Sequence, residues 1–165
     1  RHARCGSDRP AASAIVCRLM DDSVGLGLYG PRPPRWADQR IKAQHMGRYV
    51  TREEKSRVFG EALACLNTFP LSEADSLNCR AFEIAGAGGL QLIEHRPAIE
   101  DCFEPGRELL VFSEYQELLD HIGRARKAPQ EMVAIRKAGA RRAVAEHTYE
   151  HRLKRVFATV EGKPQ

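Results

Sequence analysis

Arg80 and Glu83 are the residues whose types and spacing best support chemistry. They stand three positions apart in a helix-forming segment, so both side chains point the same way. A guanidinium near a helix N-terminus binds phosphate together with unpaired backbone N–H groups, and a carboxylate further along binds ribose hydroxyls. The pair therefore indicates a nucleotide site, with an ordinary surface ion pair as the alternative at this spacing.

The segments around this pair have the layout of a βαβ unit. Apolar runs at 62–66 and 90–93 frame a polar loop and the helix-forming segment, which ends in glycines. Asp75 is by type a good N-cap for a helix over 76–87, and glycines in this place usually end a helix. We expect the loop to lie at the carboxyl edge of the sheet, where open α/β sheets bind ligands.

The same alternation of strand and helix continues through the chain. Strands are expected at 24–29, 48–50, 62–67, 90–94 and 108–112, and helices at 11–20, 52–61, 76–87, 98–102, after 113, and over 129–160 with breaks near Gly139 and His147. Capping boxes at Thr51 and Ser113 open two of the helices. Parallel strands joined by helices need crossover connections, so the sequence predicts an α/β, Rossmann-like, doubly wound parallel sheet with C-terminal helices.

The length of 165 residues suits one domain with one core. Residues 1–9 show no periodicity and are expected to be a loose lead-in or a remnant, which leaves 10–165 as a single domain. Because the first residue is Arg1 rather than Met, we also expect a processed chain or a piece of a longer protein.

Composition limits the classes of binding partner and the cellular compartments that we expect for this protein. The net charge is +4, and 26 basic residues are interspersed with 22 acidic ones, which argues against nucleic acid as the main partner. The five cysteines show no CxxC pair and no spacing typical of zinc, so we expect no metal and a reducing, cytoplasmic location. No apolar stretch reaches the length of about 18 residues that a membrane span requires.

Two further motifs have simple interpretations. Gly25, Gly27 and Gly30 match the GxGxxG pattern of dinucleotide-binding proteins, but prolines follow where a helix should open, and the expected acidic position near residue 50 has Tyr49 and Val50 instead. Gly30 remains a candidate for close approach of the backbone to a ligand. His147 and His151 have a helical metal-ligand spacing without a third ligand nearby, so we expect exposed helix histidines.

Several ordered blocks resemble the C-terminal domain of GT-B glycosyltransferases, and in particular the CgeB-like and group 1 families. The blocks are Asn67, DSLNCRAFEIAGAGG at 75–89, FEPGRE at 103–108 and EHTYEHR at 146–152. The resemblance extends over about residues 24–160. It implies that residues 10–165 are a single Rossmann-like nucleotide-sugar-binding domain, one half of a GT-B fold. In that fold a nucleotide-sugar lies in the cleft between this domain and an N-terminal Rossmann-like domain.

The resemblance also implies roles for individual residues. Asp75 and Glu83 occupy the two positions of the E-x7-E pattern of the family, with Asp in place of the first Glu. Glu83 would bind the ribose, Asp75 would lie near the donor sugar and diphosphate, Arg80 would steady the diphosphate, and Asn78 would add a hydrogen bond. No catalytic residue, cofactor or metal is implied beyond the donor, because the acceptor site and general base usually lie on the N-terminal domain. This chain alone is expected to turn over its donor poorly.

The alternative function is a non-catalytic binding module. A Rossmann-like scaffold with a vestigial site would then use its basic C-terminal helices to contact a partner protein or an anionic surface. The basic residues concerned are Arg136, Lys137, Arg141, Arg142, Arg152, Lys154 and Arg155.

Overall fold

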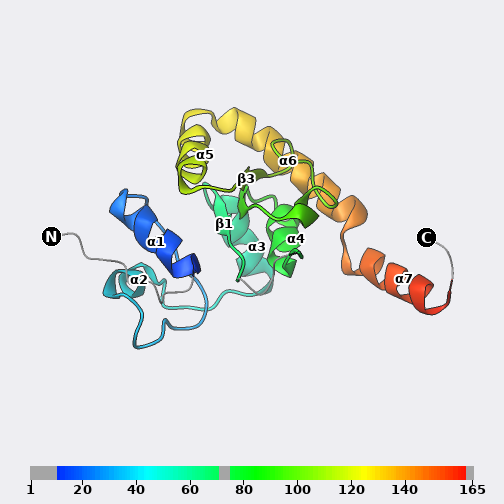
Figure 1. Ribbon diagram of the computed structural model, residues 1–165, viewed down its shortest axis with the longest axis horizontal. Coiled ribbons are helices and arrows are strands. Elements are labelled where there is room, and N and C mark those ends of the chain that lie inside the picture. Colours follow the sequence, from blue (N-terminus) through cyan, green and yellow to red (C-terminus); the bar gives the residue numbers. More distant parts are fainter. Residues whose placement is uncertain (1–10, 71–74, 163–165) are drawn as a thin grey trace.

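A parallel sheet of three strands lies at the centre of the computed structural model, which describes residues 11–70 and 75–162 (Figure 1). Strands β1 (Cys65–Asn67), β2 (Gln91–Glu94) and β3 (Leu110–Phe112) are adjacent in that order. Because neighbouring strands are parallel, their carboxyl ends meet at one edge of the sheet. These strands confirm the three central strands that the apolar runs predicted.

Helices connect the strands and continue beyond the last one. In chain order within the described residues they are α1 (Ala11–Asp21), α2 (Gln39–Gln44), α3 (Arg52–Glu61), α4 (Cys79–Gly86), the 3-10 turn η1 (Pro97–Ile99), α5 (Tyr115–Lys127), α6 (Pro129–Glu146) and α7 (Tyr149–Val160). In Figure 1, α7 continues from the end of α6 and extends away from the sheet. None of these helices is both long enough and apolar enough to cross a membrane.

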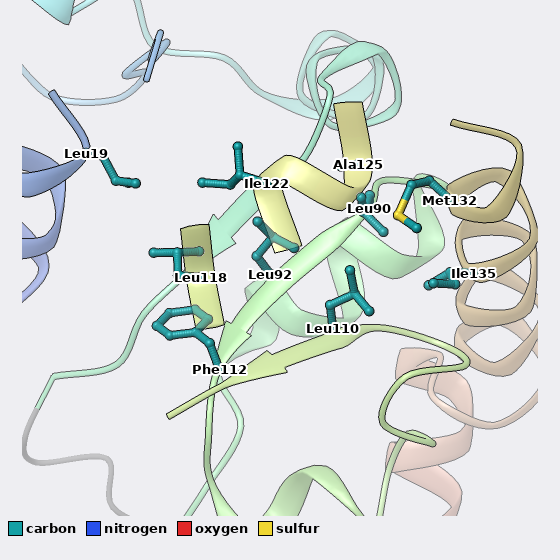
Figure 2. Close-up of a cluster of buried hydrophobic side chains, with 10 residues drawn as sticks. All are labelled: Leu19, Leu90, Leu92, Leu110, Phe112, Leu118, Ile122, Ala125, Met132 and Ile135. Atoms are coloured by element: carbon teal, nitrogen blue, oxygen red, sulfur yellow. The ribbon is translucent and has the colours of Figure 1, made fainter. Parts of the chain in front are cut away.

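The core has two parts, one on each face of the sheet. Leu92 and Ile93 are neighbours on β2 and point to opposite faces, because side chains alternate along a strand. Leu92 packs with α5 and with Leu19 of α1 in the cluster shown in Figure 2. Ile93 packs with Ala81 and Ala85 of α4. Helices therefore cover both faces, which confirms the α/β, Rossmann-like fold with C-terminal helices.

The expected strands at 24–29 and 48–50 are wrong. The structure has a single bridge between Leu28 and His45 in this part of the chain. No residue of 24–29 is buried, and exposed and half-buried residues alternate as far as Gly27, so the segment has too little apolar contact to extend a ladder. The expected lead-in, residues 1–9, lies outside the described residues.

Two expected helix starts differ in detail. α3 begins as predicted, but the Thr51 side chain makes no capping bond, since Arg52 has a left-handed φ of 49° that disrupts the capping geometry. α5 has its capping box one residue later than expected: Glu117 accepts the backbone N–H groups of Ser113 and Glu114. Both cases show that a cap depends on the local backbone as well as on residue type.

The expected break in α6 at Gly139 is also wrong. The helix is continuous, and Gly139 is buried where α6 approaches the backbone of Glu108. A Cβ atom added at Gly139 would lie 2.4 Å from the Glu108 carbonyl oxygen. The glycine therefore allows close packing rather than ending the helix. The second expected break is confirmed, because His147 is the C-cap of α6.

Candidate functional site

A reciprocal pair of amides fixes the start of α4 at the carboxyl edge of the sheet. Asn67, fully buried at the end of β1, donates from Nδ2 to Asn78 Oδ1 over 3.1 Å, and Asn78 Nδ2 donates back to Asn67 Oδ1 over 3.1 Å. Asn78 Oδ1 also accepts the Ala81 backbone N–H at 3.2 Å. Asn78 is therefore the N-cap of α4, and the helix N-terminus points toward this edge.

Asp75 does not have the capping role that its residue type predicted. It lies three positions before the N-cap and is exposed. The amide pair explains the difference, because it satisfies both side chains and thereby selects Asn78 as the last residue before the helix. Asp75 lies in the loop that leads into α4, on the carboxyl side of β1.

A second polar cluster lies at the carboxyl end of β2. Glu94 Oε2 accepts the backbone N–H of Phe69 at 3.0 Å, and Glu94 Oε1 lies 3.3 Å from Arg96 Nη1. The Arg96 guanidinium lies over the Phe69 ring, 4.9 Å from its centre. These contacts hold the chain where it leaves β1 against the residues that follow β2.

A pocket of about 340 Å³ lies beside α4, at the corner between α6 and α7. Its lining residues are Leu77, Cys79, Phe82, Glu83, Gly86, Ala143, Val144, His147, Thr148, Tyr149 and Arg152. The walls are mostly apolar, and the Arg152 guanidinium lies over the Phe82 ring, 4.2 Å from its centre. The pocket thus offers an aromatic surface beside one carboxylate and one guanidinium.

Glu83 lines this pocket, whereas Arg80 does not. The Glu83 carboxylate accepts a hydrogen bond from Lys55 Nζ of α3 at 2.6 Å, and both side chains are about one-third exposed. Such a partly exposed ion pair contributes about 0–1 kcal/mol to stability. Within the described residues no ion pair joins Arg80 to Glu83, and Arg80 is exposed on the first turn of α4. The alternative of an ordinary pair between these two residues is therefore wrong.

The hydrogen bonds of Gly30 are with Arg48 and His45 and not with residues of α4. It has a φ of 130°, a backbone conformation that favours glycine. Its N–H donates to the Arg48 carbonyl at 3.2 Å, and its carbonyl oxygen lies 3.1 Å from His45 Nε2. Gly30 is not among the pocket residues, so the structure does not bring it together with Glu83.

His147 is buried, contrary to the expectation of exposed helix histidines. Its side chain is only 8% exposed, and Nε2 lies 2.8 Å from the carbonyl oxygen of Cys102. The ring packs against Phe82 and Phe103, with centre-to-centre distances of 5.1 and 5.4 Å. Within the described ranges no three His, Cys, Asp or Glu side chains gather as metal ligands. His147 is thus a buried residue that also lines the pocket.

We expect His147 to make folding stability depend on pH. Burial lowers the pKa of His147; the Cys102 carbonyl and Glu146 oppose this effect, and the charges of Arg142 and Arg152 reinforce it. In the unfolded chain the pKa of this histidine is about 6.5. As the pH falls below that value, His147 becomes protonated in the unfolded chain but stays neutral in the folded chain. The free energy of unfolding therefore decreases until the pH reaches the lowered pKa of the folded state.

The measurement is urea unfolding at about pH 7.5 and about pH 5.5, which lie on either side of the unfolded histidine pKa. His147→Gln keeps a donor for the Cys102 carbonyl but does not titrate, so it should show a smaller loss of stability at the lower pH than the wild type. Equal losses in both proteins would contradict the assignment.

Sequence reasoning assigned no part in the site to several of these positions. Asn67 and Glu94 each end a predicted strand, and a polar residue at that place is a signal that could have been used. Lys55 and Arg152 reach the site from α3 and α7, and nothing in their local sequence indicates these contacts. Only the packing of helices distant in sequence brings them together.

Comparison with known protein families agrees with the family resemblance found in the sequence. A family model described as glycosyl transferase-like matches residues 9–158. No curated protein matches the chain. The matched region includes the whole sheet, α4 and the residues that line the pocket, and it agrees with the resemblance to group 1 glycosyltransferases. Since the match covers most of its length, the chain belongs to the glycosyl transferase-like family.

Proposed function

We propose that this chain is the donor-binding domain of a GT-B glycosyltransferase, which transfers a sugar from a nucleotide-sugar to an acceptor. The observation that carries the proposal is the Glu83 carboxylate in a pocket beside α4, whose N-terminus lies at the carboxyl edge of a parallel sheet. Membership of a glycosyl transferase-like family supports the same function. The site residues are Asp75, Asn78, Arg80 and Glu83.

The side-chain chemistry of each site residue suggests its role in donor binding. Glu83 accepts hydrogen bonds from the ribose hydroxyls, after exchanging or sharing its contact with Lys55. The Ala81 N–H is capped by Asn78, but the N–H groups that precede it in the first turn of α4 have no partner within the helix, and together with the exposed Arg80 they favour a diphosphate at the sheet edge. Asn78 holds these N–H groups in place.

The same positive end of α4 suits the chemical step. Transfer breaks the bond between the anomeric carbon of the sugar and the diphosphate oxygen, so negative charge develops on the leaving nucleoside diphosphate. A helix N-terminus and a guanidinium placed beforehand at that oxygen stabilise the transition state more than the ground state. Asp75 is exposed in the loop before α4, and on this proposal it contacts the donor sugar.

The acceptor and the general base belong, on this proposal, to an N-terminal partner domain. α7 supports such a partner, because it has no buried residues. Its exposed apolar side chains are Tyr149, Leu153, Val156, Phe157 and Val160. Their spacing places them on one face of the helix, and an apolar face of this kind needs a covering surface. A cytoplasmic location is part of the proposal, and it is supported by Cys65, Cys79 and Cys102, which carry thiols rather than disulfides.

Titration with nucleotides tests the proposal. UDP, GDP and ADP are added separately at millimolar levels while amide NMR signals or the unfolding temperature are followed. We expect at least one nucleotide to shift the signals of α4 and to raise the unfolding temperature, because a ligand that binds the folded state stabilises it. No response to any of the three, with the partner domain absent or present, would overturn the proposal.

The rival function is a binding module that uses the basic C-terminal helices. Two of its basic residues already serve the fold: Arg136 donates to the carbonyls of Gly60, Ala62 and Leu63, and Arg142 donates to Cys102. Reversing the charges of the exposed Lys154 and Arg155 distinguishes the two functions. Nucleotide binding should be retained under the glycosyltransferase proposal, whereas the rival requires loss of partner binding.

A further inference from the structure

The pocket beside α4 extends to the start of that helix. Leu77 and Cys79, which stand on either side of the N-cap Asn78, both line the pocket. Glu83, about one turn further along α4, lines it as well. A ligand in the pocket can therefore contact the Glu83 carboxylate and also lie close to the first N–H groups of α4, where the proposed function places the diphosphate.

Arg152 brings a guanidinium to this pocket from the first turn of α7. It lies over the Phe82 ring, 4.2 Å from the ring centre. Phe82 stands three positions after Cys79 on α4, so these two side chains lie on the same side of the helix. The ring is itself packed against Phe103 and His147, with centre-to-centre distances of 5.5 and 5.1 Å. Arg152 therefore rests on a packed aromatic ring beside the N-terminal half of α4.

The hydrogen-bond donors of the Arg152 side chain are available to a ligand. Within residues 11–70 and 75–162, no carboxylate or carbonyl oxygen accepts a hydrogen bond from this guanidinium. Glu83, the carboxylate in the same pocket, is paired with Lys55 instead. A guanidinium that lies over a ring keeps the N–H groups at the edge of its plane free, and their fork matches two oxygen atoms of a phosphate. The pocket thus holds a cation suited to an anionic group.

We propose that Arg152 binds the diphosphate of the donor, across the pocket from the N-terminus of α4. The inference rests on the proposed function and adds to its site a residue from α7. Arg80 approaches the diphosphate from the first turn of α4, so the two guanidinium groups come from separate elements. A cation already in place on a packed ring stabilises the negative charge that develops on the leaving diphosphate, since it needs no rearrangement during the transfer.

Three variants of α7 separate this role from packing. Arg152→Met keeps a long, flexible side chain that can cover the Phe82 ring, but it removes the charge and the donors. Arg152→Lys keeps the charge and loses the planar fork. Arg155→Met is the matched control, because Arg155 is exposed on the same helix and does not line the pocket. α7 has no buried residues, so all three variants should fold, which urea unfolding checks.

Binding is measured by NMR titration with UDP, GDP and ADP at low and at high salt, and with the matching nucleosides, which carry no phosphate. For whichever nucleotide binds the wild type, we expect Arg152→Met to lower the affinity for the diphosphate about tenfold and to make it less dependent on salt. Arg152→Lys should lose less affinity, and Arg155→Met should bind like the wild type. The affinity for the nucleoside should stay within about twofold in all three variants.

Wild-type affinity of Arg152→Met for the diphosphate would overturn the role of Arg152. So would a loss that is equally large for the nucleoside or that leaves the salt dependence unchanged, because such a loss would come from packing. Either result leaves the proposed function standing. Absence of nucleotide binding by the wild type, with the partner domain absent or present, would overturn the proposed function and, with it, the role of Arg152.

Discussion

Replacing Glu83 by alanine is expected to weaken nucleotide binding by about 10- to 100-fold, the cost of losing hydrogen bonds to a charged acceptor. Glu83 is the only carboxylate among the residues that line the described pocket, so no neighbour can take over its hydrogen bonds to ribose. The fold should survive, because the side chain is partly exposed and its ion pair with Lys55 contributes little. Calorimetric or NMR titration with UDP, GDP and ADP measures the affinity, and urea unfolding measures the stability.

Two control variants make this result specific. Lys55→Ala also removes the ion pair with Glu83, but it leaves the carboxylate in the pocket, so nucleotide binding should be retained. Glu131→Ala removes an exposed glutamate in the first turn of α6, which pairs with Arg124 in the last turn of α5, away from the pocket. If Glu83→Ala bound nucleotide like the wild type, or if Lys55→Ala lost as much affinity, the role of the carboxylate in ribose binding would be wrong.

The central βαβ unit was predictable because its signals are strong and local. The strands lie in apolar runs of the sequence, and the central strand β2 is buried on both faces. The glycines after α4 end the helix in the expected way, with Gly88 at a left-handed φ of 71°. The segment 24–29 misled because its apolar residues resemble a buried strand. Val24 and Leu26 do pack against the core, but Gly25 and Gly27 between them have no side chains to bury on the other face. A composition of this kind does not reveal whether a neighbouring strand is present.

The site was harder to predict than the fold because it depends on distant contacts. The resemblance selected both the 75–89 block and the 146–152 block, and the structure shows that residues of both blocks line one pocket. Nothing in either block indicates that Phe82 meets His147 and Arg152. The choice of Asn78 over Asp75 as N-cap likewise depends on Asn67, which lies on another element.

The approach of α6 to the sheet gives the largest expected change in stability. We expect Gly139→Ala to lower the free energy of unfolding by about 1–3 kcal/mol, the usual cost of overpacking a buried site. The new Cβ would lie 2.4 Å from the Glu108 carbonyl oxygen, and a backbone atom cannot rotate away as a flexible side chain can. Urea denaturation measures this change, and nucleotide titration of the folded fraction shows whether the pocket is altered.

Gly123→Ala is the matched control, since Gly123 also lies within a helix but a Cβ there would meet nothing within 4 Å. Alanine should therefore stabilise α5 by about 0.5–1 kcal/mol through its higher helix propensity. Opposite signs at the two glycines would show that contact with Glu108 decides the result. A stabilising effect of Gly139→Ala would instead mean that α6 can move away from the sheet. The pocket at the C-terminal end of α6 depends on the packing of α6 against α4, so in that case the pocket would not be rigid.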